Sequence, residues 1–214
     1  MLHRPFGPYE RFFKRPLDLL LSSFTLILLS PVFLILFFLV RIKLGSPVLF
    51  VQERIGKDEK PFKLYKFRSM TNKRDTNGKL LPDAERLTAF GSLLRSTSLD
   101  ELPELINIAK GDMALIGPRP LLVQYLPYYT EKEKHRHDIR PGLSGLAQVN
   151  GRNHVKWDQR LAMDVEYVNK ITFCGDIKII LRTINNVFSR KDIAPDTVSV
   201  EPYLDEERKG RQST

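Results

Sequence analysis

The stretch LDLLLSSFTLILLSPVFLILFFLV, from Leu17 to Val40, decides how this chain folds. Its only ionisable residue is Asp18, and the rest is mainly Leu, Ile, Val and Phe with a few hydroxyl residues and one proline. As one helix it would be about 36 Å long, enough to cross the hydrocarbon core of a bilayer, which is about 30 Å thick. A single spanning helix is therefore the simplest interpretation of this segment.

Two features of the run favour a re-entrant hairpin instead. Pro31 lies near its middle, where it removes a backbone hydrogen bond and bends a helix, and Ser30 offers a hydroxyl to a freed carbonyl. Both flanks are basic, with Lys and Arg at residues 11–15 and 41–43, so neither end is favoured for the far side of a membrane. The sequence thus predicts a membrane anchor over residues 1–45 that turns at Ser30-Pro31 and leaves by the face it entered.

A strongly basic segment follows this anchor. Residues 41–80 hold eleven Lys or Arg against four Asp or Glu, within a chain of net charge +9. Such a segment can meet nucleic acid, anionic lipid or a phosphorylated substrate. Its position directly after the apolar run favours anionic lipid at a membrane surface, or a phosphorylated substrate, as the partner of this segment. No nucleic-acid-binding motif accompanies the charge, so we expect no nucleic-acid partner.

The remaining chain is predicted to be α+β and mostly helical, with one cytoplasmic body over residues 46–190. Short β-prone runs at 48–52 and 62–67, joined by a polar link at 56–60, predict a β-hairpin. Apolar stripes at helical spacing predict one helix over 84–94, one over 157–168 and one over 177–188, the last able to lie on a membrane surface as an amphipathic interface helix. From 191 to 214 prolines and charges replace this periodicity, so the tail is expected to be loose.

Two adjacent acids, Asp100 and Glu101, are the first candidates for chemistry. Adjacent carboxylates can divide two tasks in phosphoryl transfer, one attacking phosphorus while the other holds a divalent cation. Downstream, Arg119 lies between prolines and offers a pre-set fork for phosphate oxygens. The alternative is structural, with Ser98 capping a helix and Glu101 reaching back in a capping box. The two interpretations are compatible, because a helix N-terminus favours phosphate.

Candidate ligands for a phosphorylated substrate lie in two further segments. Lys66 lies within the second β-prone run and Arg68 directly follows it. By default these residues form a solvated face, but beside a phosphate site they could be the approach for an anion. The glycine-rich stretch that starts at Arg140 and ends at Arg152 adds Gln148, and together these side chains suit a nucleotide diphosphate. Its glycine spacing matches neither a Walker nor a dinucleotide-binding motif.

Three residues that could carry chemistry are expected to be structural. His135 and His137 would point to different sides of a helix and alternate with basic residues, so we expect them on the solvated surface rather than on a metal. Cys174 is the single cysteine, which leaves no partner for a disulfide, and we expect it to be a small buried apolar residue.

Residues 11–190 resemble the monotopic phosphoglycosyl transferases, a family of bacterial sugar transferases. The order and spacing of nine short motifs together carry the resemblance: Lys14-Arg15, Ser30-Pro31, Gln52-Glu-Arg54-Ile-Gly56, Lys66-Phe-Arg-Ser-Met70, Leu99-Asp-Glu-Leu102, Lys110-Gly-Asp-Met113, Gly117-Pro-Arg-Pro120, Arg140-Pro-Gly142 and Gly145-Leu-Ala-Gln-Val-Asn-Gly-Arg152. The family implies transfer of a sugar-1-phosphate from a UDP-sugar to a polyprenyl phosphate, usually undecaprenyl phosphate. UMP is released, and the product starts a surface glycan or glycoprotein glycan that downstream glycosyltransferases extend.

The resemblance also implies a role for each matching residue. Asp100 would be the nucleophile that forms a covalent phosphosugar, and Glu101, beside it, would hold Mg²⁺. Arg119 would bind phosphate, with Arg152 and Lys66 near the nucleotide or the phosphosugar. The re-entrant hairpin would fix the body on the cytoplasmic face of the bacterial inner membrane, in contact with its phospholipids.

A rival interpretation of the same residues is a non-catalytic membrane-surface protein. Its hairpin would anchor it, residues 41–80 would bind anionic lipid, and Asp100-Glu101 would only begin a helix. Release of UMP from a UDP-sugar separates the two interpretations. Neither specifies the sugar or the oligomeric state.

Overall fold

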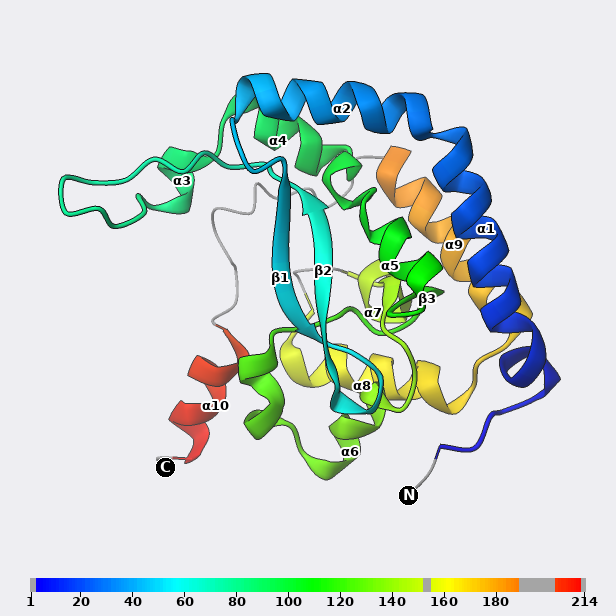
Figure 1. The fold of residues 1–214 in the computed structure, drawn as a ribbon. Helices are drawn as coiled ribbons and strands as arrows, with labels where there is room; N and C mark the ends of the chain where they lie inside the picture. The colour runs from blue at the N-terminus through cyan, green and yellow to red at the C-terminus, as the bar shows by residue number, and fades with distance from the viewer. Residues whose placement is uncertain (1–2, 152–154, 189–202, 213–214) are drawn as a thin grey trace.

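The computed structural model describes residues 3–151, 155–188 and 203–212. Its first elements are a π-helical turn, Tyr9–Phe13, and two helices, α1 (Lys14–Leu28) and α2 (Ser30–Lys43). In Figure 1, α1 runs along one side of the molecule and α2 continues across its top. The chain bends by 64° between them, and no single helix among the described residues is long and apolar enough to cross a membrane.

The break between α1 and α2 confirms the predicted break point. Leu29 separates the helices, and Pro31 lies in the first turn of α2, where its missing N–H costs no helical hydrogen bond. The Ser30 hydroxyl donates to the Ile27 carbonyl over 2.8 Å, as expected for a serine beside a broken helix. The helices meet at an open angle rather than as a closed hairpin.

Helix α1 has its polar side against the body and its apolar side outward. Lys14, Asp18 and Ser22, spaced by four residues, are all buried. The Lys14 ammonium lies 2.6 Å from Asp176, and Asp18 accepts a hydrogen bond from the Leu115 N–H at 3.1 Å. The outward residues of α1 are large, apolar and exposed, namely Leu19, Leu20, Phe24, Ile27 and Leu28. This is the reverse of the pattern of a helix on a water-exposed surface.

The predicted β-hairpin is confirmed, and it is longer than the sequence indicates. Strands β1 (Leu49–Ile55) and β2 (Pro61–Phe67) pair antiparallel through a 3₁₀ turn at Lys57–Glu59. A second sheet was not expected: β3 (Ala114–Ile116) pairs parallel with β4 (Gly142–Ser144), which lies inside the glycine-rich stretch. A Cβ on Gly142 would lie 2.0 Å from the Gly117 nitrogen, so the close approach of these strands requires glycine.

The body is mostly helical, with short elements around the hairpin (Figure 1). Their bounds are α3 Asp83–Arg86, α4 Ala89–Ser96, η3 Leu99–Glu101, α5 Glu104–Lys110, η4 Val123–Tyr128, α6 Glu131–Lys134, η5 His135–His137, α7 Leu146–Val149, α8 Trp157–Asn169, α9 Phe173–Phe188 and α10 Leu204–Gln212. The single helix expected over 84–94 is wrong. Leu87 instead pairs with Met70 in extended conformation, and Thr88 begins a new helix by accepting from the Gly91 N–H at 3.1 Å.

The helices near the C-terminus match the predicted stripes to different degrees. In α8 the whole predicted stripe is buried, from Trp157 to Val168. Helix α9 starts earlier than predicted. Of its predicted stripe, Ile177, Leu181 and Ile184 are exposed, whereas Ile179, which the prediction did not include, is buried. The apolar face of α9 is thus only partly covered by the protein.

Three structural expectations are wrong. His137 is buried at 4% exposure, because Arg136 beside it forms a buried ion pair with Asp164 at 2.8 Å and draws the turn inward. Cys174 is exposed instead of buried, since it lies near the start of α9 on its outer side. The described part of the tail is not loose, because α10 buries Leu204 completely.

Candidate active site

A cavity of about 1520 Å³ opens between the hairpin, the segment from α4 to α5, and the α7–α9 region. Its wall contains several residues that the sequence put forward: Lys66, Arg68, Asp100, Glu101, Arg119 and Gln148. These side chains come from four segments that are far apart in the sequence. The cavity is large enough for a nucleotide-sized ligand.

The acids Asp100 and Glu101 reach this cavity because they do not cap a helix. Ser98 adopts a left-handed conformation, with φ of 55°, and its side chain makes no capping hydrogen bond. The capping box is therefore wrong. Leu99 to Glu101 form a 3₁₀ turn, and α5 begins only at Glu104, with Pro103 at its N-cap. The turn frees both carboxylates to face the cavity.

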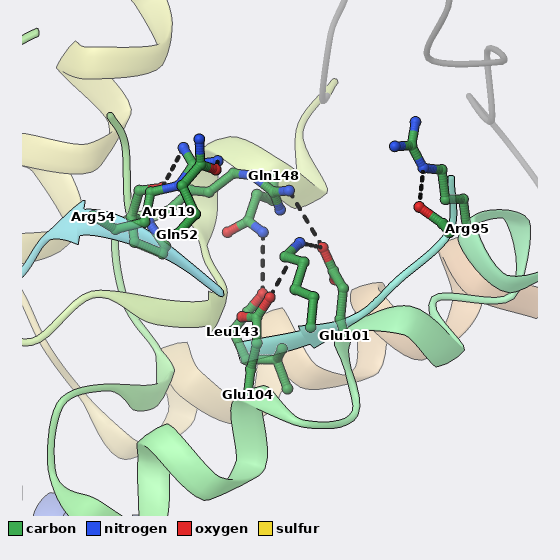
Figure 2. A network of polar contacts seen from close by, with 11 residues as sticks. Gln52, Arg54, Arg95, Glu101, Glu104, Arg119, Leu143 and Gln148 are labelled. Atoms are coloured by element: carbon green, nitrogen blue, oxygen red, sulfur yellow. Dashed lines mark hydrogen bonds and ion pairs between the residues drawn. The ribbon is translucent and has the colours of Figure 1, made fainter. Parts of the chain in front are cut away.

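Lys66 lies between two carboxylates at the centre of the site. Its Nζ is 2.7 Å from Oε1 of Glu101 and 3.1 Å from Oε1 of Glu104 (Figure 2). Arg119 reaches the same Glu101 oxygen, with Nη2 at 3.3 Å. Burial alone would raise the pKa of Glu101, but the charges of Lys66 and Arg119 lower that pKa to about 2. Glu101 is therefore an anion throughout the physiological range.

Glu104 is a third carboxylate, which the sequence reasoning missed. It is 3% exposed, and burial, together with the charge of Glu101, raises its pKa to about 7. In the sequence it follows Pro103 like any acid in a first helical turn. Only the fold brings it to Lys66, which lies on the second strand of the hairpin.

Asp100 is 8% exposed and lies beside this cluster. Burial, and then the charge of Glu101, raise its pKa to about 6, whereas Lys66 and Arg95 act in the opposite direction. Near neutral pH the carboxylate is mostly ionised and has little contact with water. A desolvated anion on a cavity wall is suited to nucleophilic attack.

The other predicted ligands lie in different places. Gln148 donates from Nε2 to the Leu143 carbonyl at 3.1 Å, while its buried Oε1 has no hydrogen-bond partner among the described residues. Arg68 lines the cavity, but it donates to the carbonyls of Met70 and Pro47 and so holds backbone in place.

Arg140, at the start of the glycine-rich stretch, does not join this cluster. Arg140 donates to the Gly111 carbonyl at 2.8 Å, at the C-terminal end of α5, and is not part of the cavity wall that the described residues form. Its selection as a substrate ligand is not supported by this placement. Arg152 lies outside the described residues.

Two further arginines on the cavity wall were not selected from the sequence. Arg54 donates to Gln52 Oε1 at 2.7 Å and to the Pro120 carbonyl at 3.4 Å, and burial and Arg119 lower its pKa to about 10. Arg95 donates to the Ser69 hydroxyl at 2.9 Å. The available signal for Arg54 was its place in the motif Gln52-Glu-Arg54.

The acidic pair fits a cation that a phosphate helps to hold. Among the described residues no group of three or more His, Cys, Asp or Glu could form a metal site, so a closed protein cage is not present in that part of the chain. Both ion pairs of Glu101 use Oε1. Mg²⁺ in nucleotide enzymes is commonly bound by one or two carboxylates together with substrate phosphates. Asp100 and Glu101 can supply that number.

Comparison with known proteins shows the family of this chain. A family model described as bacterial sugar transferase matches residues 9–190. EpsL of Bacillus subtilis (strain 168), named as an uncharacterised sugar transferase, is 49% identical over 180 residues, or 84% of this chain and 89% of that protein. The undecaprenyl-phosphate galactose phosphotransferase of Salmonella typhimurium is 39% identical over 198 residues, or 85% of this chain and 41% of that protein. The UDP-glucose:undecaprenyl-phosphate glucose-1-phosphate transferase of Escherichia coli (strain K12) is 38% identical over 199 residues, or 87% and 42%.

The chain therefore belongs to the bacterial sugar transferase family and is an enzyme, a phosphoglycosyl transferase. It spans about two fifths of the length of the Salmonella and Escherichia relatives and most of the Bacillus one.

Proposed function

We propose that this enzyme transfers a sugar-1-phosphate from a UDP-sugar to a polyprenyl phosphate such as undecaprenyl phosphate, with release of UMP. The observation that carries the proposal is the buried Asp100 beside the Glu101–Lys66–Arg119 cluster on the cavity wall. The names of the Salmonella and Escherichia relatives support the acceptor, and that of the Escherichia relative supports the donor. The reaction would be the first membrane step of a glycan that downstream glycosyltransferases extend.

Asp100 performs the first chemical step in this proposal. A carboxylate oxygen attacks the sugar-bearing phosphorus, the bond from that phosphorus to the bridging oxygen breaks, and UMP leaves with the electron pair. The product is a sugar phosphate bound to Asp100 as an acyl phosphate. An oxygen of the lipid phosphate then attacks the same phosphorus, and the Asp100 carboxylate leaves. No external energy source is needed, because one phosphoanhydride replaces another.

The surrounding charges allow an anion to attack a diphosphate. Lys66, Arg54 and Arg119 lie where they can bind phosphate oxygens and offset the repulsion. Glu101, with Asp100 beside it, would hold Mg²⁺, which supplies further positive charge to the diphosphate. Gln148 presents its buried Oε1 as an acceptor for a hydroxyl or N–H of the donor.

The lipid acceptor accounts for the N-terminal helices. The outward apolar face of α1 and the exposed apolar residues of α2 support a re-entrant anchor that enters and leaves one leaflet. Lys14, Asp18 and Ser22 form a polar stripe that is buried against the body, and the ion pair of Lys14 with Asp176 holds the anchor there. In this proposal the protein is monotopic and its catalytic body lies on the cytoplasmic face of the bacterial inner membrane.

Release of UMP tests the proposed function. The purified full-length chain in detergent is given Mg²⁺, polyprenyl phosphate and each member of a panel of UDP-sugars. We expect UMP from at least one donor, no UMP with Asp100→Asn, and unchanged release with Glu131→Gln, a control carboxylate that is not part of the described cavity wall. A wild-type enzyme that releases no UMP from any donor contradicts the proposal and leaves the non-catalytic lipid-binding alternative.

A further inference from the structure

The C-terminal helix α10 lies outside the residues that the family model matches. The family match ends at residue 190, whereas α10 spans Leu204–Gln212. It is nevertheless built into the body, because Leu204 is 0% exposed within a core that contains Tyr125 and Trp157. Figure 1 shows α10 on the opposite side of the hairpin from α5.

A buried arginine fastens α10. Arg208 donates to both carboxylate oxygens of Glu133, at 2.6 and 2.7 Å. It also donates to Asp158 at 3.1 Å and to the Tyr128 carbonyl at 2.5 Å. Four hydrogen bonds from one guanidinium fix both the position and the rotation of the helix.

This anchoring places one aromatic side chain on the wall of the catalytic cavity. Tyr203 directly precedes α10, is 56% exposed, and lines the same cavity as Asp100 and Arg119. The helix also packs on η4, which follows the Arg119 turn in the chain. An exposed aromatic ring held by a rigid anchor beside cationic side chains is a surface on which a flat ring can stack.

We infer that Tyr203 is a donor-binding residue, and that its ring packs against a ring of the nucleotide-sugar in the cavity that Asp100 also lines. This inference rests on the proposed function. The contact requires the face of a ring, which the planar nucleobase presents directly and the sugar ring presents as its C–H face. Helix α10, which lies outside the residues that the family model matches, then shapes the donor pocket.

Steady-state kinetics of UMP release test the inference with a donor that the wild-type enzyme uses. We expect Tyr203→Ala to raise the donor KM about tenfold, the loss typical of one stacking contact. Tyr203→Phe keeps the ring and should match the wild type. Glu206→Ala is the control, because Glu206 is an exposed residue of α10 outside the cavity wall.

Product inhibition by UMP distinguishes the two rings. If Tyr203 stacks on the nucleobase, Tyr203→Ala weakens inhibition by UMP as much as it raises the donor KM. If it packs on the sugar, inhibition by UMP is unchanged and the preference among UDP-sugars shifts. Thermal unfolding of each variant in detergent checks that α10 stays docked.

Two negative results of these experiments would lead to different conclusions. An active wild-type enzyme whose donor KM and sugar preference are unchanged by Tyr203→Ala overturns the inference and leaves the proposed function intact. A wild-type enzyme that releases no UMP from any donor overturns the proposed function, and the inference falls with it.

Discussion

Nζ of Lys66 lies 3.1 Å from a carboxylate oxygen of Glu104, a residue that is itself buried and follows the proposed nucleophile by four positions. Because Lys66 also contacts Glu101, its single positive charge serves two carboxylates in the described structure. The protonation of Glu104 therefore sets how much positive charge is left for a phosphate. This relationship connects the pH of the solution to donor binding.

Glu104→Gln should remove part of the pH dependence of donor binding. Burial raises the pKa of Glu104 to about 7, so above that pH the wild-type site gains a negative charge that repels a diphosphate. We expect the wild-type donor KM to rise several-fold between pH 6 and 8.5, and the KM of Glu104→Gln to stay nearly flat. Equal pH dependence in both proteins would show that Glu104 does not act on the donor.

The rate should rise with pH through the titration of Asp100. Only the ionised carboxylate attacks phosphorus, and burial raises its pKa to about 6, so kcat/KM is expected to fall below that pH. Arg95 favours the ionised form, so Arg95→Gln should move the acid limb of the profile to higher pH. A profile of kcat/KM between pH 5 and 8 checks both statements. An acid limb that shifts to lower pH in Arg95→Gln is incompatible with this arrangement of charges.

Asp100→Asn should be more stable than the wild type at neutral pH. The folded-state pKa of about 6 lies above the ordinary value of 3.8, so the fold disfavours the ionised form. The wild type therefore loses stability, relative to a side chain that does not titrate, as pH rises from about 4 through 6. A shift of about two pKa units corresponds to about 3 kcal/mol.

Thermal unfolding in detergent measures this difference. The Tm of Asp100→Asn is expected to exceed that of the wild type by several degrees at pH 8, and to approach it at pH 4. Removal of the exposed control carboxylate in Glu131→Gln should leave the Tm unchanged at both pH values. A Tm of Asp100→Asn below that of the wild type at pH 8 would contradict the burial argument.

The re-entrant anchor predicts that both of its ends lie on the same side of the membrane. His3→Cys and Lys60→Cys, each made in a Cys174→Ser background because Cys174 is exposed, should resist an impermeant thiol reagent in intact cells. Both should react after the cells are opened. Pro31→Ala removes the proline from the break and should favour a straight helix, exposing residue 3. Labelling of His3→Cys from outside in the otherwise unchanged chain would establish a spanning helix.

Local patterns sufficed for several parts of the fold. Pro31 encodes the break between α1 and α2 directly. A proline lacks a backbone N–H and its ring clashes with the preceding turn, so it interrupts a helix at its own position. Alternation and a polar link encode the hairpin, and the spacing from Trp157 to Val168 encodes α8. Asp100 and Glu101 were identifiable as a pair because they are adjacent in sequence.

Local sequence patterns could not predict features that depend on residues far apart in the sequence. Glu104 is a site residue only because the hairpin brings Lys66 to it, and His137 is buried because Arg136 pairs with Asp164, far along the chain. Strands β3 and β4 are too short to show a period, so the sequence does not predict them. Arg140 had suitable chemistry in the sequence, but its neighbours direct it to the end of α5.

Rapid-quench mass spectrometry detects the proposed covalent phosphosugar on Asp100. The full-length enzyme in detergent is mixed with Mg²⁺ and a UDP-sugar that it uses, without lipid acceptor, and stopped in acid within one turnover. We expect a mass increase of one sugar phosphate on the peptide that contains Asp100, absent from Asp100→Asn and present in Glu131→Gln. No adduct on Asp100, together with kinetics that require donor and lipid phosphate in one ternary complex, would contradict the claim and indicate direct attack by the lipid phosphate.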